Sequence, residues 1–337
     1  MNPGQRTEGR YLDLPEGELA RRAAKGLTML EQCRVCPHEC RVNRRRGELG
    51  ICKTGFEVSL GAAVPHFGEE PVLVGRHGVG NIFVSSCNLK CRYCQNFEIS
   101  HDRLGAPAGT TRLALAMLAL EQAGCDLVGW VSPSHVVPQL LAALARAVEL
   151  GFTRPVVYNT SSWDAHSSLR LLDGVVSIYL PDLKYSDDEV ARRLSGCCGY
   201  VGRARAALEE MYRQAGNLTV GADGLATGGL LVRHLVLPND LAGSWESLSY
   251  LRIEFGRDIG LSVMSQYAPT ERVAEHPELN RAVTRAEYDR VLDMVADLGF
   301  RHVFVQDFES QKIGLPSFAL RVPFTWPQAP QTVHRVA

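Results

Sequence analysis

The sequence predicts an α/β protein: a partial or complete parallel (βα) barrel with an N-terminal cysteine-rich module. Two observations predict it. After residue 60, short apolar segments of strand length alternate with longer segments of helical period about six or seven times, which is typical of a parallel βα sheet. Before that point, residues 31–60 contain four cysteines and no long periodic segment. We therefore expect this stretch to need a bound structural metal in order to fold.

The alternating segments follow one another in order along the chain. Predicted strands cover 81–86, 126–132, 155–160, 176–184, 228–238, 259–267 and 302–308. Predicted helices cover 113–124, 136–151, 187–196, 200–216 and 284–300, and the second of these ends on a capping glycine, Gly151. We therefore expect three parts: residues 1–60 with a helix and the cysteine-rich module, residues 61–315 with the barrel, and residues 316–337 as a tail and possible lid.

Composition narrows the functional classes. The 337-residue chain has a net charge of −1, which argues against a broad electrostatic surface for nucleic acid or membranes. No apolar run reaches transmembrane length, and the first residues lack the apolar core of a signal peptide, so we expect a cytoplasmic protein. Ten cysteines in such a chain indicate metal or redox chemistry in preference to disulfides.

Cys87, Cys91 and Cys94 have the spacing C-x3-C-x2-C directly after the first predicted strand of the series. A zinc site takes four protein ligands, or three with a water, whereas each iron of a [4Fe–4S] cluster takes one thiolate. Three thiolates leave one iron free to bind the amine and carboxylate of S-adenosylmethionine (SAM). Tyr93 adds an aromatic surface that could pack on an adenine. The alternative is three buried or zinc-binding cysteines.

This loop and its preceding strand resemble the radical SAM superfamily. Further blocks occur in order on successive strand ends and resemble the pyruvate formate-lyase activating enzyme-like branch over residues 30 to 300: GELGIC, EEPVLVG, VSPSHVVPQ, YNTSSWD, IYLPDLKY, LLVRHLVLP and VMSQYAP. The chain departs from the usual pattern at residues 161–163 and at Ser177, positions that we expect on the substrate side of the barrel.

The resemblance implies the cofactors and the reaction class. A [4Fe–4S] cluster would bind at the three cysteines with SAM, and an external one-electron reductant of the flavodoxin or ferredoxin type would supply the electron. SAM would be cleaved to a 5′-deoxyadenosyl radical, which takes a hydrogen atom from the substrate. The candidate cofactor-binding residues lie near predicted strand ends: Tyr93, Gly129, Ser132, Ser134, Asn159, Asp182, Lys184, Arg233 and His234.

Each of these residues also has an ordinary structural interpretation. The segment from Gly129 to Ser134 would be the counterpart of the Gly-rich segment that meets the methionyl amine, or a plain βα turn. Asp182 and Lys184 could form a solvated ion pair. Arg233 lies in an apolar strand, where it needs an anionic partner that a cofactor carboxylate would provide.

His234 could equally be a hydrogen-bonded histidine of the core. Gln266 and Tyr267, at the end of the next strand, are expected to line the substrate cavity.

A second cysteine set has the spacing C-x2-C-x3-C-x11-C and comprises Cys33, Cys36, Cys40 and Cys52. Four thiolates close a site completely, as a second [4Fe–4S] cluster or a zinc ion requires. The presence of an iron–sulfur barrel favours the cluster, and free cysteines in a loop are the alternative. Cys125, Cys197 and Cys198 have no such spacing and are expected to pack in the ordinary way.

Two functional classes fit this reading. The first is a lyase that acts on a small sugar-like molecule, similar to the decarboxylases of sugar-acid nucleosides such as cytosylglucuronic acid in antibiotic pathways. That chemistry needs a carboxylate base, for which Glu189, Glu31 and Glu209 are candidates, although each could be a solvated surface charge. The second is an oxidoreductase, a glycyl-radical activase that acts on a partner protein. A non-catalytic iron–sulfur scaffold would need only the cysteines, so the ordered strand-end blocks argue against it.

Overall fold

Parallel strands form the centre of the protein. The computed structural model describes residues 8–312, 315–324 and 333–335. Within these ranges one sheet has the order β3-β1-β2-β4-β5-β6-β8-β9-β10-β11, with β7 paired to β8. The parallel strands are β2 (Val79–Val84), β4 (Val128–Val131), β5 (Val156–Thr160), β6 (Ile178–Pro181), β8 (Ala226–Leu235), β9 (Gly260–Met264) and β10 (His302–Gln306). The described strands thus form an open arc, a partial barrel, and confirm the predicted fold class.

Antiparallel strands extend this sheet at its edges. They are β1 (Val58–His66), which pairs with β2, β3 (Ala106–Ala108), which pairs with β1, β7 (Thr219–Val220) and β11 (Val333–Arg335), which pairs with β10. None of the four was among the predicted strands. β1 is half-buried and its sequence VSLGAAVPH has no strict alternation, so it gives a weak strand signal.

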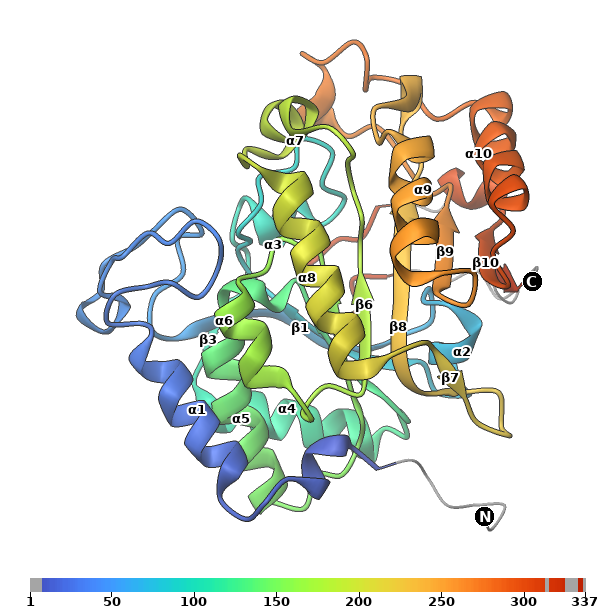
Figure 1. Ribbon diagram of the computed structural model, residues 1–337. Helices are drawn as coiled ribbons and strands as arrows, with labels where there is room; N and C mark the ends of the chain where they lie inside the picture. The colour runs from blue at the N-terminus through green and yellow to red at the C-terminus, as the bar shows by residue number, and fades with distance from the viewer. Residues whose placement is uncertain (1–7, 313–314, 325–332, 336–337) are drawn as a thin grey trace.

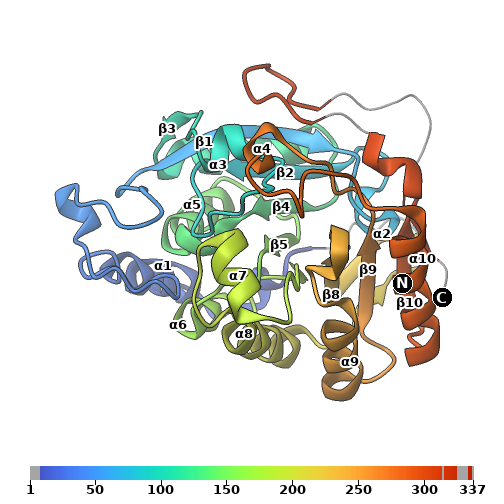
Figure 2. The same ribbon diagram turned by 90° about the horizontal axis from the view of Figure 1, so that it is seen from above.

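Helices cover the outer face of the arc, as Figures 1 and 2 show. Their bounds are α1 (Glu18–Thr28), α2 (Pro71–Val74), α3 (Phe97–Ser100), α4 (Thr110–Gln122), α5 (Val137–Glu149), α6 (His166–Leu169), α7 (Asp188–Ser195), α8 (Tyr200–Ala215), α9 (Ser244–Phe255) and α10 (Arg285–Leu298). All five predicted helices of the alternating series are present, and α9 is an additional one. Every residue of β2, β4, β6 and β9 is buried, because helices on one side and the barrel interior on the other cover both faces.

The cysteine-rich module lies outside the arc, in the loops drawn in blue at the left of Figure 1. Between α1 and β1 the structure has turns and one short 3-10 helix, Arg44–Arg46, as the absence of periodicity predicted. The division at residues 60 and 315 stays a prediction. Residues 325–332 and 336–337 of the predicted tail lie outside the described residues.

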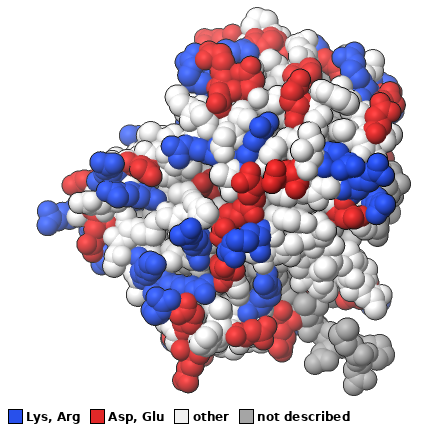
Figure 3. Space-filling view, in the orientation of Figure 1, with Lys and Arg blue, Asp and Glu red and all other residues white. Residues whose placement is uncertain are grey.

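The surface charge matches the composition. On the face shown in Figure 3, basic and acidic side chains are interspersed. Among the described residues, the helices are too short or too polar for any of them to cross a membrane.

Candidate functional site

The three-cysteine loop begins at the C-terminal end of β2, where parallel βα proteins place their chemistry. Each sulfur has a hydrogen-bonding neighbour. The Leu89 amide lies 3.4 Å from the Cys87 sulfur, and the Ser195 hydroxyl donates to Cys91 across 3.0 Å. The Ser100 hydroxyl lies 3.1 Å from the Cys94 sulfur. These donors stabilise negative charge on sulfur, so the loop suits thiolate ligands.

Burial makes free thiolates costly in this loop. It raises the pKa of Cys87 to about 12, with a further contribution from the neighbouring Cys91. Burial also raises the pKa values of Cys91 and Cys94. The positive charge of Lys184 works in the opposite direction and lowers both. A bound metal centre removes this cost because it takes up the negative charge.

The number of thiols in the loop bears on the kind of metal centre that it could hold. Among the described residues, no group of three or more Cys, His, Asp or Glu side chains is arranged to hold one metal ion. In a cubane cluster each thiolate binds a different iron, so its ligands stand farther apart than those of a single ion. Three thiolates on one loop would therefore bind three irons of such a cluster and leave the fourth iron without a protein ligand.

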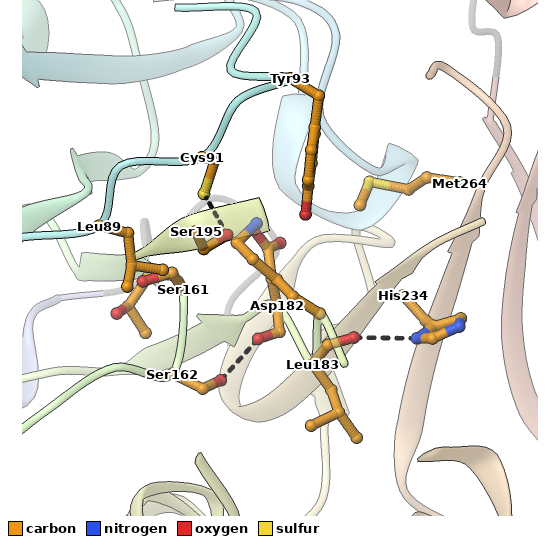
Figure 4. Close-up of polar contacts among 12 residues, drawn as sticks. Leu89, Cys91, Tyr93, Ser161, Ser162, Asp182, Leu183, Ser195, His234 and Met264 are labelled. Atoms are coloured by element: carbon orange, nitrogen blue, oxygen red, sulfur yellow. Dashed lines mark hydrogen bonds and ion pairs between the residues drawn. The ribbon is translucent and has the colours of Figure 1, made fainter. Parts of the chain in front are cut away.

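A chain of hydroxyl groups connects Tyr93 to the cysteine loop. Its hydroxyl lies 2.7 Å from that of Tyr185, which in turn lies 2.6 Å from the Ser195 hydroxyl that donates to Cys91. Figure 4 shows Cys91, Ser195 and Tyr93 turned toward the same space above Asp182. The Tyr93 ring is buried and makes edge contacts with Tyr185 and Tyr267, so the structure positions it beside the cluster loop.

Asp182 and Lys184 form a mostly buried ion pair of 2.5 Å just after β6. Burial favours the neutral form of Lys184, yet the negative charges of Asp182 and of the nearby Cys91 raise the pKa of Lys184 above its usual value. Lys184 therefore stays positively charged next to the cysteine loop. The pair is neither solvated nor remote from the predicted cofactor site.

Arg233 on β8 already has anionic partners within the protein. Its guanidinium binds both oxygens of Glu70, with Nε 2.8 Å from Oε1 and Nη2 2.6 Å from Oε2, and it also contacts Glu69. Glu69 in turn accepts a hydrogen bond of 2.7 Å from Asn81 on β2. Glu69 and Glu70 thus supply the anionic partner that Arg233 needs in its apolar strand. The expectation that a cofactor carboxylate provides this partner is not met, because the chain itself provides it.

His234 is bound into the core. Nδ1 lies 2.9 Å from the Leu183 carbonyl, a contact drawn in Figure 4, and Nε2 lies 2.9 Å from the Ser244 hydroxyl. Burial lowers its pKa, so the ring is neutral. This is the arrangement of a hydrogen-bonded core histidine.

The remaining candidates follow β4 and β5. A Cβ on Gly129 would lie 2.1 Å from Asn81 Oδ1, so this glycine is required for packing beside Asn81. Ser132 has a left-handed backbone with φ 53°, and the buried Ser134 hydroxyl lies 3.0 Å from that of Thr160. Asn159 lines the central cavity.

The central cavity has a volume of about 170 Å3 and adjoins the cysteine loop through Gln95 and Asn96, which directly follow Cys94. Its other lining residues are His66, Gly68, Glu69, Glu70, Phe83, Val131, Asn159, Arg233, Met264, Gln266, Gln306, Ser310, Leu315, Pro316 and Phe324. Gln266 lines the cavity as predicted. Tyr267 is buried and donates to the Leu279 carbonyl across 2.6 Å.

The three predicted carboxylate bases lie elsewhere. Glu189 is exposed on α7 and pairs with Arg192, and Glu31 is exposed and lies 3.5 Å from Arg45. Glu209 is exposed on α8 and accepts a hydrogen bond of 3.2 Å from Tyr250. All three are therefore charges on the protein surface, and none of them lines the central cavity.

Glu69 and Glu70 are the carboxylates that line the cavity among the residues that the structure describes. The EEPVLVG block contained them, but nothing local in the sequence showed that they face Arg233.

The positions where the chain departs from the usual pattern lie at two different ends of the barrel. Ser177 precedes β6 and contacts the Arg10 amide at 3.5 Å, so it lies at the end opposite to the cavity. Our expectation that it faces the substrate is wrong. Trp163 is buried, and its ring stacks on that of Tyr200.

The four N-terminal cysteines are brought together, since all of them line one small cavity with Arg44 and His135. Burial raises the pKa of Cys36 to about 12, with contributions from the other three thiols. The module contacts the barrel through His38 Nε2, which lies 2.7 Å from the carbonyl of Asn88 in the three-cysteine loop. The two cysteine sites therefore lie against each other.

Comparisons with known proteins give one curated relative. The chain is 29% identical over 273 residues to an uncharacterized protein of Methanocaldococcus jannaschii, which covers 79% of this chain and 75% of the relative. No protein-family model matches the chain.

Among solved structures, methylornithine synthase (PylB) matches 87% of this chain and 72% of its own at 14% identity and a TM-score of 0.44. The FeFe-hydrogenase maturase HydG from Carboxydothermus hydrogenoformans matches 88% of this chain at 12% identity and the same TM-score. SuiB from Streptococcus suis matches 67% at 13% identity and a TM-score of 0.44. The chain spans about half the length of SuiB and 59% of HydG. The C-x3-C-x2-C loop after the first parallel strand is the feature by which the chain resembles the radical SAM superfamily.

Proposed function

We propose that this protein is a radical SAM enzyme that acts on a small polar substrate. One observation carries the proposal: three thiols with hydrogen-bond donors lie at the C-terminal end of β2, and the residues that follow them line the central cavity. When bound, a [4Fe–4S] cluster and SAM supply reductive bond cleavage and hydrogen-atom abstraction at the edge of this cavity.

The chain's own residues would position that chemistry. Cys87, Cys91 and Cys94 would bind three irons of the cluster, and its fourth iron would be open to SAM. Lys184 places a positive charge beside the thiolates, and Ser195 donates to one of them. Asn159 and Gln266 offer amide groups to the cofactor or substrate from the cavity wall.

The tail favours a small molecule over a protein partner. Leu315, Pro316 and Phe324 line the cavity, and the Phe318 ring lies 5.5 Å from that of Phe83 on β2. An activase must admit a loop of another protein, whereas here the tail packs against the cavity wall. We therefore prefer the small-molecule lyase, and glycyl-radical activation is the second candidate.

Within this class we propose decarboxylation of a nucleoside sugar acid such as cytosylglucuronic acid. Hydrogen abstraction beside a hydroxyl, followed by loss of the hydroxyl proton, would let a neighbouring carboxylate leave as carbon dioxide, and the product radical would then take up one electron from the external reductant and a proton. Glu69 and Glu70 line the cavity, but both are paired with Arg233, so we propose that they accept hydrogen bonds from substrate hydroxyls and leave the identity of the base open. A flavodoxin- or ferredoxin-type donor would supply the electron.

The test uses protein reconstituted anaerobically with iron and sulfide and supplied with SAM and a low-potential reductant. We expect 5′-deoxyadenosine and carbon dioxide with cytosylglucuronic acid, and neither with Cys87→Ala. The matched control is Cys125→Ala, since Cys125 is a buried cysteine outside both sites and should keep full activity. Turnover only with a glycyl-radical enzyme as partner would reject the lyase and support the activase, and a wild-type protein without any cubane spectrum would reject both.

A further inference from the structure

We propose that Cys33, Cys36, Cys40 and Cys52 hold a closed iron–sulfur cluster whose negative charge is balanced by the buried Arg44. This inference concerns a second centre and does not depend on the reaction proposed for the first. It rests on the proposed function only in assuming that the cell loads this protein with iron and sulfide.

Arg44 is a buried cation without an acidic partner. The residue is 1% exposed. Its Nε donates to the Gly55 carbonyl across 2.9 Å and Nη1 to the His135 carbonyl across 2.7 Å. No Asp or Glu of the described residues forms an ion pair with it, and Nη2 has no hydrogen-bond partner there. Burying a guanidinium without an opposite charge costs several kcal/mol, so a negative group is expected nearby.

The four cysteines are the groups that can carry this charge. All four line the cavity that Arg44 also lines, and Nη1 lies 3.9 Å from the Cys33 sulfur. Glu39 lines the same cavity, but it is exposed and makes no ion pair with Arg44 among the described contacts. Metal binding converts the thiols into thiolates and releases their protons, which creates the anion that Arg44 lacks.

The loop around the cavity is shaped for sulfur ligands. A Cβ on Gly50 would lie 2.8 Å from the Cys40 sulfur, so only glycine lets the backbone pass this close. The next amide, of Ile51, donates to the same sulfur across 3.4 Å. Backbone N–H groups directed at sulfur are typical partners of iron–sulfur thiolates.

Two observations favour a cluster over zinc. The four sulfurs line one cavity, and their module lies against the three-cysteine loop to which the proposed function assigns a cluster. Four thiolates match the four irons of a cubane one to one, so this site is closed, unlike the three-cysteine site.

Arg44, the proposed counter-ion, also forms a hydrogen bond between the cysteine-rich module and the barrel. Arg44 belongs to the module, whereas His135, whose carbonyl it binds, lies between β4 and α5. The ring of His135 reaches the Ser85 carbonyl, 3.3 Å away at the end of β2. Cluster assembly in the module is therefore expected to stabilise its docking beside the first site.

The first experiment isolates the second centre. The triple variant Cys87→Ala, Cys91→Ala and Cys94→Ala is reconstituted anaerobically, and its iron, sulfide and zinc contents are measured together with its absorption and electron paramagnetic resonance spectra. We expect about four irons and four sulfides per chain, because the N-terminal thiols are intact. Zinc without iron, or no metal at all, would overturn the proposal. Because this variant cannot cleave SAM, the result is independent of the reaction proposed above.

The second experiment tests Arg44 as counter-ion. In the triple variant, Arg44→Met should shift the cluster's reduction potential to a lower value, because loss of a nearby positive charge disfavours the extra electron, and Arg44→Lys should restore part of the shift. An unchanged potential in Arg44→Met would contradict the assignment.

A third experiment compares the thermal unfolding temperatures of the protein with and without its N-terminal cluster. It gives a readout even where too little loaded variant is obtained for a redox titration. Arg44→Met should lower the unfolding temperature of the loaded protein and raise or preserve that of the stripped protein, in which Arg44 has no anion. The control is Arg154→Met, because Arg154 is equally buried but has a carboxylate partner, Glu121, at 3.1 Å. It should lower both temperatures alike. Equal losses for Arg44→Met in both states would reject the counter-ion role.

Discussion

The guanidinium of Arg233 binds the carboxylate of Glu70 at two points, with Nε 2.8 Å from Oε1 and Nη2 2.6 Å from Oε2. The two residues are 163 positions apart in the chain and are both buried at the wall of the central cavity. A two-point pair of this kind fixes the orientation of both side chains. It therefore helps to set the shape of the cavity wall.

Replacing Arg233 with Met should destabilise the protein strongly. The change leaves Glu69 and Glu70 buried without a counter-charge, for which a loss of about 3–5 kcal/mol in the free energy of unfolding is expected. Urea denaturation measures it. Arg301→Met is the control, because Arg301 forms an exposed pair with Asp258 and should change stability by less than about 1 kcal/mol. Similar losses in both variants would show that burial of the Arg233 pairs does not matter.

The carboxyl group of Glu69 should make stability depend on acidity. Burial is the largest single influence and works to raise its pKa, but the charges of Arg233 and His66 and the hydrogen bonds from Arg233 and Asn81 together lower the pKa from 4.5 to about 2. Below pH 4.5 the unfolded chain takes up a proton that the folded protein resists, so stability is full above that pH and falls toward pH 2.

The pH effect of Glu69 can be separated from that of the other acids by comparison with Glu69→Gln. The free energy of unfolding, measured between pH 6 and pH 3, should fall more steeply for the wild type than for the variant. Parallel curves would mean that Glu69 has no depressed pKa in the folded protein.

Removing the Ser195 hydroxyl should alter the cluster proposed at Cys87, Cys91 and Cys94 without preventing its assembly. A hydrogen bond to a thiolate raises the reduction potential of an iron–sulfur cluster, so Ser195→Ala should shift that potential to a lower value. A redox titration followed by electron paramagnetic resonance measures it. Ser247→Ala is the control, since the hydroxyl of this buried serine on α9 donates to the Ala242 carbonyl and, among the described contacts, to no cysteine. An identical potential in wild type and Ser195→Ala would argue against Cys91 as a ligand.

Gly129→Ala tests the packing that positions the cavity wall. The added Cβ would lie 2.1 Å from Asn81 Oδ1, so Asn81 must move and its hydrogen bond to Glu69 must stretch or break. We expect a loss of about 1–3 kcal/mol, as for other overpacked cores. Gly202→Ala on α8 is the control: it meets open space and should stabilise the helix by up to about 1 kcal/mol. A neutral Gly129→Ala would show that Asn81 can adapt freely.

The strands and helices that the sequence predicted share one property. Buried parallel strands are uniformly apolar and the covering helices are amphipathic, so both give periodic signals that depend only on neighbours in the chain. β1 and the short β3 and β7 escaped prediction because half-buried or exposed antiparallel strands have weak patterns.

The candidate site divides in the same way. The two cysteine sets were recognisable because ligand spacing within one loop is a local property. The exposed positions of Glu31, Glu189 and Glu209 could not be recognised from the sequence. A single glutamate carries no local pattern that tells whether it lines a cavity or lies on the surface.

The order of parallel strands and helices and the two groups of clustered thiols were determined by the sequence alone, because each depends on residues a few positions apart. Only the tertiary structure decided which charges meet: Arg233 with Glu69 and Glu70, Lys184 with the cysteine loop, and Arg44 with the four thiols of its module. The physical reason is that a buried charge is compensated by whichever opposite charge the folded chain brings within a few ångströms, and that partner can come from any distance along the sequence.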